Sequence, residues 1–232
     1  HVYGLYHRLQ DSGRELLQLM VKAIEARDPY TSGHSVRVAA LSKAIAQDLR
    51  LPFDMVERIY TAALLHDVGK IHEEFAPLLR KAAKLSPEEE ATLQTHSVKS
   101  AELVGVITAF RGVVQDSVRS HHERWDGAGY PDRLSAQGIP HGARIITISD
   151  TVDAMTTDRP YRLAASGEMA LIEIHRCRGT QFDPRLVDAA LGSVVFRALV
   201  SAPHESTMLT QLAETAPVSV EHRTSGWRTA TG

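Results

Sequence analysis

Apolar residues recur at helical spacing along most of this chain, and on several of the resulting stripes an ionisable side chain stands among them. His34 precedes Val38 by four residues and His66 follows Ile59 by seven, so each imidazole shares the apolar face of its helix. A buried ionisable group without a partner is costly. We therefore expect the inward groups of different helices to converge, because together they satisfy one another by binding cations.

The spacing of apolar residues predicts an all-α fold, a single helical bundle with a long functional loop, since no segment shows convincing strand alternation. Two helix starts carry the residues of a capping box, Ser86 with Glu89 and Asp54 with Glu57. The turn formers of residues 126–131 predict the loop. The expected helices cover residues 15–27, 33–49, 54–66, 86–96 with a break near 95–97, 106–122, 143–157, 168–176 and 184–199.

The same pattern divides the chain into three parts. Residues 15–200 form the expected domain, and residues 1–14 are a linker or the end of an upstream helix. Residues 201–232 are rich in serine and threonine and weakly periodic, which indicates a weakly structured C-terminal appendage.

Seven inward histidines and aspartates are candidate metal ligands. One buried histidine alone is more often a hydrogen-bonded core residue, but two adjacent doublets and three further groups in one helical chain favour a metal site. Nitrogen and carboxylate ligands without thiolates suit Fe, Mn, Zn or Ni, and seven ligands exceed the needs of one ion, so two divalent ions are expected. The candidates are His34, His66, Asp67, His96, His121, His122 and Asp150.

Composition excludes several other classes. The 232 residues carry a formal net charge of -2, which argues against a general DNA- or RNA-binding protein. The single cysteine, Cys177, allows no intrachain disulfide and fits a reducing, cytoplasmic compartment. The sequence contains no run of 18 apolar residues, so no membrane span is predicted. The first residue is His1 rather than methionine, so we expect the sequence to be part of a longer protein.

An ordered series of motifs resembles the HD-GYP family, a branch of the HD-domain metal-dependent phosphohydrolases, over about residues 28–191. A histidine-aspartate doublet alone would be weak evidence, whereas the ordered series is highly specific. The motifs are Asp28-Pro-Tyr-Thr-Ser-Gly-His34, His66-Asp-Val-Gly-Lys70, His121-His-Glu-Arg-Trp-Asp-Gly-Ala-Gly-Tyr-Pro131, Ile139-Pro-His-Gly-Ala-Arg144, Asp150-Thr-Val-Asp-Ala154, Asp158-Arg-Pro-Tyr-Arg162 and Gly179-Thr-Gln-Phe-Asp-Pro184.

The resemblance implies an HD-type helical bundle and a phosphodiesterase that hydrolyses cyclic di-GMP to pGpG or GMP. By motif match, His34, His66, Asp67 and Asp150 hold one ion, with Asp67 bridging to a second ion held by His96, His121 and His122. His96 is carried over as the histidine of the helix after Ser86-Pro87, although residues 72–77 depart from the commonest family pattern. Some relatives hold a third ion through a glutamate, but that position is Tyr30 here, which favours two ions.

The expected mechanism is attack on phosphorus by a hydroxide that bridges the two ions. Asp67 and Lys70 are the expected catalytic residues, Lys70 as a donor near the phosphate. The expected substrate-binding residues resemble the family's phosphate contacts or belong to the loop, and one of them, Asp153, orients a ligand or Lys70. They are Gly129, Tyr130, Asp153, Arg159 and Arg162.

Two other functions stay open at this point. The chain could be a cyclic di-GMP receptor or interaction module without activity, although every position of the metal pattern is filled. It could also be an HD phosphohydrolase for another cyclic nucleotide or dinucleotide, against which the intact Gly-Tyr-Pro loop argues. An upstream sensory or receiver domain, signalling-protein partners and a homodimer are the further expected partners.

Overall fold

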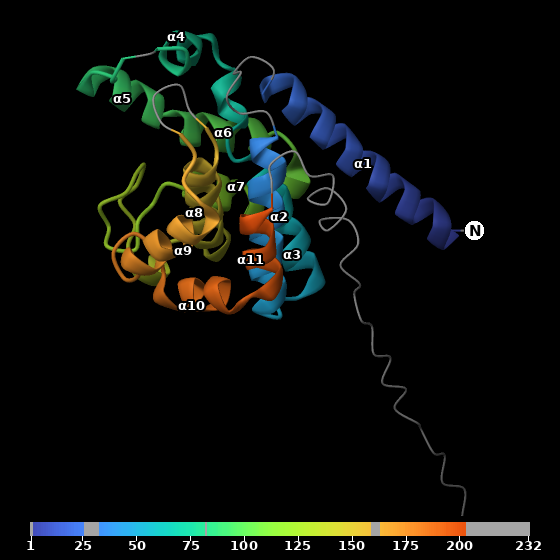
Figure 1. The fold of residues 1–232 in the computed structure, drawn as a ribbon. Coiled ribbons are helices and arrows are strands. Elements are labelled where there is room, and N and C mark those ends of the chain that lie inside the picture. The colour runs from blue at the N-terminus through green and yellow to red at the C-terminus, as the bar shows by residue number, and fades with distance from the viewer. Residues whose placement is uncertain (1, 26–32, 82, 159–162, 203–232) are drawn as a thin grey trace, which may run out of the picture.

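The computed structural model describes residues 2–25, 33–81, 83–158 and 163–202. In these ranges the secondary structure is helical, with one isolated bridge between Arg178 and Phe182. The predicted all-α fold is confirmed, and Figure 1 shows the helices gathered into one bundle, with α2 beside α3.

The helices begin and end close to the predicted positions in most of the chain. The α-helices are α1 (Val2–Glu25), α2 (His34–Asp48), α3 (Phe53–Leu65), α4 (Ala76–Leu79), α5 (Pro87–Gln94), α6 (His96–Gly105), α7 (Val113–Arg119), α8 (His141–Thr156), α9 (Gly167–Arg176), α10 (Pro184–Gly192) and α11 (Val194–Ser201). Short 3-10 helices are η1 (Val68–Ile71), η2 (Glu73–Phe75), η3 (Thr108–Phe110) and η4 (Ala136–Gly138).

Two hydrophobic clusters lie on opposite sides of the central helices. The first joins α2, α3 and α8 to α9, α10 and α11 through residues such as Ile45, Ile148 and Phe196. The second joins the same three helices to α1, α6 and α7, and includes Val118 and Ile146. Because α2, α3 and α8 contribute to both clusters, their positions are held from two sides, which makes them a rigid frame for a site.

One of the two predicted capping boxes is confirmed and the other is wrong. Ser86 Oγ accepts the N–H of Glu89, and the Glu89 carboxylate accepts the N–H of Ser86 at the start of α5. The helix predicted from Asp54 begins one residue earlier, with Pro52 at the N-cap and no side-chain cap. Asp54 therefore lies inside the first turn, where its negative charge still interacts favourably with the helix dipole.

Two helices predicted as continuous are interrupted. Ser193 is extended and its Oγ accepts the N–H of Phe196, so α10 ends at Gly192 and α11 begins anew. Within the segment predicted over 106–122, the α-helix covers only Val113–Arg119. Gly112, at φ 81° and ψ -123°, cannot continue a helix. The predicted break at Thr95, between α5 and α6, is confirmed.

Helix α1 is longer than predicted and leaves much of its apolar surface exposed. It begins at Val2 rather than near residue 15, so the expected boundary after residue 14 falls within one helix. Val21 and Glu25 are buried, whereas Leu16, Leu19 and Met20 are 58%, 64% and 51% exposed. The apolar stripe that the sequence shows on this helix therefore faces outward, and Figure 1 shows α1 extending beyond the bundle.

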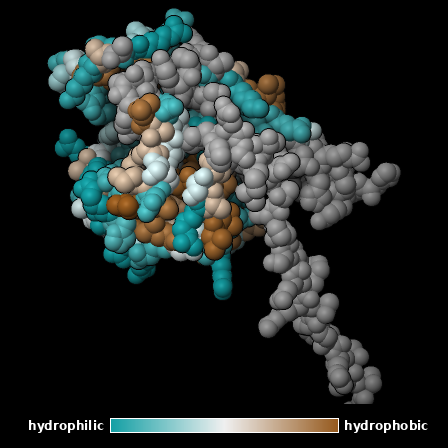
Figure 2. Space-filling view, in the orientation of Figure 1, coloured by the Kyte–Doolittle hydropathy of each residue, from teal (hydrophilic) through white to brown (hydrophobic). Residues whose placement is uncertain are grey.

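The surface of the remaining helices is mixed. Figure 2 shows hydrophilic areas interleaved with smaller hydrophobic ones on the coloured part of one face. Among the described residues, none of the helices combines the length and the apolar character that crossing a bilayer requires.

Candidate metal centre

The seven candidate ligands lie together although they come from five separate places in the chain. They form three overlapping groups in which the ligand atoms lie within 4.8 Å of one another. His34 begins α2, His66 and Asp67 follow α3, His96 begins α6, His121 and His122 follow α7, and Asp150 lies within α8. The groups are His34, His66 and Asp150, then His66, Asp67 and His121, then His96, His121 and His122.

Three of the histidines are oriented by the same local device. The Nδ1–H of His66, His96 and His121 each donates to the carbonyl three residues earlier, at 2.7, 2.6 and 2.6 Å. A carbonyl can only accept, so Nδ1 carries the proton and Nε2 keeps its lone pair. Each of these residues sits at or just beyond a helix end, where such a carbonyl has no partner within the helix. The result is three Nε2 atoms ready to bind a cation.

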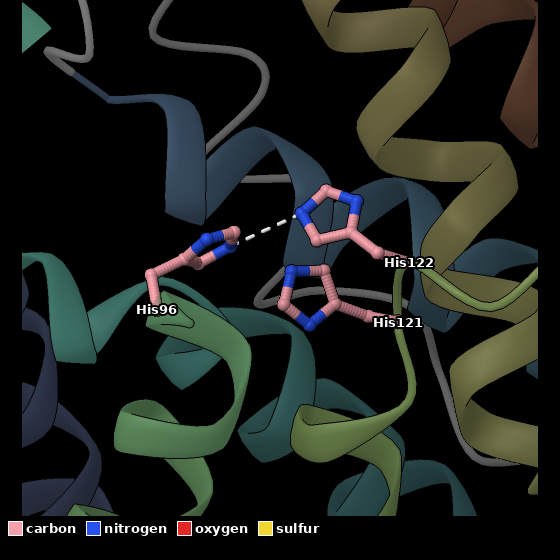
Figure 3. A group of neighbouring side chains, drawn as sticks. All are labelled: His96, His121 and His122. Atoms are coloured by element: carbon pink, nitrogen blue, oxygen red, sulfur yellow. Dashed lines mark hydrogen bonds between the residues drawn. The ribbon is translucent and has the colours of Figure 1, made fainter. Parts of the chain in front are cut away.

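The imidazoles meet through their Nε2 atoms. Those of His34 and His66 lie 3.2 Å apart, and those of His96 and His122 lie 3.1 Å apart. Figure 3 shows the rings of His96, His121 and His122 converging from two segments of the chain. Two lone pairs at such a distance repel unless a proton or a metal ion lies between them. His121 Nε2 is buried and has no hydrogen-bond partner among the described residues, so this donor set fits metal ions.

Asp67 lies between the two histidine groups. Its Oδ2 is 3.5 Å from His66 Nε2 and 3.8 Å from His34 Nε2. Its Oδ1 is 3.2 Å from His96 Nε2 and 4.0 Å from His121 Nε2, and this buried atom has no hydrogen-bond partner within the described chain. One carboxylate thus offers one oxygen to each group, which is the arrangement that a bridging ligand requires.

Asp150 and Asp153 both extend from α8 toward His34, but they contact different atoms of its imidazole. Asp150 Oδ1 lies 3.5 Å from His34 Nε2, on the ligand side. Asp153 is 2% exposed; its Oδ2 accepts from His34 Nδ1 at 2.7 Å and its Oδ1 from Arg37 Nε at 2.5 Å. Of the two roles expected for Asp153, orienting a ligand or Lys70, the structure shows contacts for the first: Asp153 is buried and holds the imidazole of His34.

Burial and neighbouring charges shift the pKa values of the cluster. Burial lowers the pKa of His66 to about 4 and that of His121 to about 3, so both imidazoles stay neutral near pH 7. For His34 burial opposes charging, but the hydrogen bond and charge of Asp153 outweigh it and raise the pKa. Burial also disfavours ionised Asp67, yet Lys70 and His66 hold its pKa well below the usual range. The centre thus offers an ionised carboxylate at Asp67 and neutral imidazoles at His66 and His121, the forms that bind metals.

Lys70 lies at the edge of the same group. Lys70 lies in η1, one helical turn after Asp67, and its Nζ donates to Asp67 Oδ2 at 2.5 Å. The lysine side chain is 23% exposed, so it also faces the open side of the centre. A phosphate approaching Asp67 would meet this ammonium group.

The Gly-Tyr-Pro loop lies against the second histidine group. The ring of Tyr130 stacks on His122 with centroids 4.7 Å apart and planes at 25°. Gly129 is buried, and a Cβ there would lie 2.6 Å from the carbonyl oxygen of His122 and 2.4 Å from Arg124 N, so a larger residue would push the loop away. Asp132 N donates to Glu123 Oε1 at 2.7 Å, which ties the loop to the residue after the histidine doublet. Gly129 thus serves the packing of the loop.

Some expected residues cannot be placed, and some supporting ones were not expected. Arg159, Arg162 and Tyr30 lie outside the described residues. His121 and His122 follow the end of α7 instead of lying on a helical face as expected. Two supporting residues were not expected from the sequence: Arg37, which holds Asp153, and Glu123, which holds the loop. The signal available in the sequence was an arginine three residues after His34, on the same apolar stripe. The structure shows this arginine buried.

Comparisons with known proteins identify the family to which the chain belongs. A family model described as the HD domain matches residues 18–186. The chain is 38% identical over 186 residues to the cyclic di-GMP phosphodiesterase response regulator RpfG of Xanthomonas campestris, covering 80% of this chain and 49% of that protein. It is 33% identical over 184 residues to 3'3'-cGAMP-specific phosphodiesterase 2 of Vibrio cholerae, covering 79% and 35%.

The chain spans less than half the length of both curated relatives. A crystal structure of a cyclic GMP-AMP specific phosphodiesterase of V. cholerae superposes with a TM-score of 0.61 at 22% identity, over 87% of this chain and 54% of that one. At this identity the superposition supports the fold alone.

Proposed function

Because the chain belongs to the HD domain family, in its HD-GYP branch, we propose that it is a metal-dependent phosphodiesterase that hydrolyses cyclic di-GMP. The relatives named above act on cyclic di-GMP or on 3'3'-cGAMP by their names, so a cyclic dinucleotide is the substrate class. The Gly129-Tyr130-Pro131 loop beside the histidines supports this assignment over a general HD phosphohydrolase.

One observation carries the proposal. The two oxygens of Asp67 face two different histidine groups, with Oδ2 near His34 and His66 and Oδ1 near His96 and His121. The residues on either side of this carboxylate would hold two divalent ions, which would supply activation of water and neutralisation of phosphate charge, as in other phosphoryl-transfer enzymes. A receptor without activity would not need this division.

The chain's own residues then have separate tasks. Asp150 and the histidines hold the cations, and Asp153 keeps the His34 imidazole turned so that Nε2 faces the centre. Lys70 donates to a phosphate oxygen beside Asp67. Tyr130 remains protonated, because burial raises its pKa, so its hydroxyl can donate to the substrate. Arg159 and Arg162 remain proposed phosphate contacts.

We propose two divalent ions, with iron or manganese as the first candidates and zinc or nickel also fitting. The support is chemical: five imidazoles and two carboxylates form the donor set, and none of the three clusters includes a thiolate. Histidine and carboxylate ligands do not select among these metals by affinity alone, since geometry and availability decide.

The test is hydrolysis of cyclic di-GMP by protein purified without oxygen and loaded with Fe²⁺ or Mn²⁺. Asp67→Asn keeps the size of the side chain but removes its charge, and His121→Ala removes a buried ligand. The matched control is His175→Ala, an exposed histidine on α9. Turnover to pGpG or GMP in wild type and control that disappears in both site variants supports the proposal.

Other outcomes assign other functions. Fully metallated protein that binds cyclic di-GMP and never cleaves it would be a receptor. Cleavage of 3'3'-cGAMP in preference to cyclic di-GMP would move the substrate to the second named class of relatives. Failure to bind or cleave either dinucleotide would refute the substrate class while leaving metal binding to be measured separately.

The remaining proposals concern context. An upstream sensory or receiver domain is supported by the length of the curated relatives, which this chain only partly spans. A homodimer is supported by the outward apolar face of α1, with Leu16 and Leu19 at 58% and 64% exposed, and sedimentation of a Leu16→Glu/Leu19→Glu variant tests it. A cytoplasmic location is supported by the single cysteine, Cys177, which fits a reducing compartment.

A further inference from the structure

Glu25, the last residue of α1, is a buried carboxylate outside the metal cluster. It is 7% exposed, although glutamate is among the residues that proteins bury least. Both of its oxygens have a partner: Oε2 accepts the N–H of Gly33 and Oε1 accepts the N–H of Ser35, each at 2.8 Å. These two residues stand on either side of His34. The carboxylate of one helix therefore holds the backbone around a metal-ligand candidate on another.

Helix α2 needs this carboxylate because it has no cap of its own. Its N-cap is Gly33, which offers no side chain, and its first turn contains no acidic residue. The first backbone N–H groups of a helix lack partners within the helix and carry partial positive charge. Glu25 supplies both the hydrogen-bond acceptors and the negative charge that a local cap would otherwise provide.

The His34 side chain is thereby held from two directions. Asp153 accepts a hydrogen bond from its Nδ1 at 2.7 Å, which sets the orientation of the ring. Glu25 accepts from the backbone N–H groups of Gly33 and Ser35, the neighbours of His34 in the chain, which holds the backbone from which the ring extends. In this arrangement His34 Nε2 lies 3.5 Å from Asp150 Oδ1 and 3.8 Å from Asp67 Oδ2.

We propose that Glu25 is a positioning residue for His34 and that it links α1 to one half of the metal centre. The inference rests on the proposed function, because it treats His34 as a metal ligand. The other half, formed by His96, His121 and His122, is anchored through α6 and the segment after α7 and does not contact Glu25. Loss of the Glu25 carboxylate should therefore act on one half only.

Glu25 could be read instead as a ligand of a further ion, since it lines a cavity with His34, Asp67 and Lys70. The hydrogen bonds argue against this, because each oxygen is already directed at a backbone N–H group. The two roles differ in stoichiometry: a positioning residue changes the affinity of an existing site, whereas a ligand adds or removes an equivalent of metal.

The experiment is a Mn²⁺ titration of the full chain stripped of metal, followed by calorimetry. His34→Ala and His122→Ala assign the two binding classes of the wild type to the two halves. Glu25→Ala is expected to weaken the His34 class by about 10- to 100-fold, the usual effect of removing a residue that orients a ligand, and to leave the His122 class within about twofold. Glu25→Gln keeps one acceptor oxygen and should fall between wild type and Glu25→Ala. Glu15→Ala, an exposed acid on the same helix, is the matched control.

Several results would overturn the proposal. Unchanged affinity of the His34 class in Glu25→Ala would show that the cap does not position the ligand. Equal weakening of both classes would indicate a general loss of folding, and loss of an equivalent that neither histidine variant removes would make Glu25 a ligand. A wild-type chain with fewer than two classes would refute the metal centre itself, and this result needs no Glu25 variant to be seen.

Discussion

Gly69→Ala is the substitution that most directly tests how the centre is assembled. Gly69 lies in η1, between Asp67 and the rest of the short helix, and packs on the start of α6. A Cβ at this position would lie 2.5 Å from Ser100 N and 2.6 Å from the carbonyl oxygen of His96. Both atoms belong to the backbone, so no flexible side chain can move aside. Relief to ordinary contact distance requires η1 and α6 to separate by about 1 Å.

The cost follows from two contributions. Overpacking in a close contact costs about 1–3 kcal/mol, and strain on the Gly69 N–H to Ser100 Oγ hydrogen bond, now 2.8 Å, adds about 1 kcal/mol. For a chain of this size about 2–4 kcal/mol lowers the melting temperature by roughly 4–15 °C. A displacement of about 1 Å between Asp67 and His96 should also reduce the hydrolytic rate by about 100-fold.

The assay is thermal unfolding together with turnover of cyclic di-GMP by the metal-loaded protein. Gly192→Ala is the matched control, because a Cβ there meets nothing within 4 Å and the residue ends α10 far from the centre. A Gly69→Ala protein that melts with the wild type and retains its rate would refute the reasoning, since it would mean that η1 and α6 do not need this contact. Lost stability with an unchanged rate would refute only the step from displacement to chemistry.

The other predictions concern the shell of the site and its protonation. Asp153→Asn should weaken Mn²⁺ binding by about 10- to 100-fold, because the neutral amide no longer offers a carboxylate to the Nδ1 of His34. A wild-type affinity measured by calorimetry would contradict this. The metal-free chain should lose stability as the pH falls from about 6.5 to about 4, because His66 stays neutral in the folded chain but is protonated in the unfolded chain. The lowered pKa of His66 reduces the free energy of unfolding by about 3 kcal/mol over this range. The lowered pKa of His121 adds to this loss, and the raised pKa of His34 opposes it. Urea unfolding at pH 7 and 4.5 checks this, and equal stability would refute it. Tyr130→Phe keeps the ring that stacks on His122 but removes the proposed hydroxyl donor, so it should raise the KM for cyclic di-GMP by about a few-fold. Tyr130→Ala removes both and should raise the KM by about 10-fold or more; equal effects of the two variants would show that the ring contributes nothing.

Local patterns in the sequence were sufficient for much of the fold. Ser86 and Glu89 form their capping box, and the predicted break at Thr95 is present, because capping depends on residues within one turn. The failures come from competition between local signals. Pro52 starts α3 ahead of Asp54, and Gly192-Ser193 divides a segment whose apolar spacing looked continuous.

The candidate ligands could be named from the sequence for a similar reason. Burying histidines and aspartates on apolar stripes is costly unless they meet, so their convergence could be expected without knowing the distances. What each carboxylate does could not be expected. Asp150 and Asp153 are three residues apart on one helix, yet one faces the histidine cluster and the other is buried between His34 and Arg37.

The sequence by itself determined the helical class, the loop and the set of ionisable groups that must share an interior, because helical periodicity and turn chemistry act within a few residues. Tertiary structure alone decided how those groups are divided. The split of the Asp67 oxygens between two histidine groups depends on how α2, α3, α6 and α8 cross, and so does the capping of α2 by Glu25 from α1. Such contacts join residues whose relative positions are fixed by side-chain packing in two separate clusters, and no local spacing encodes that packing.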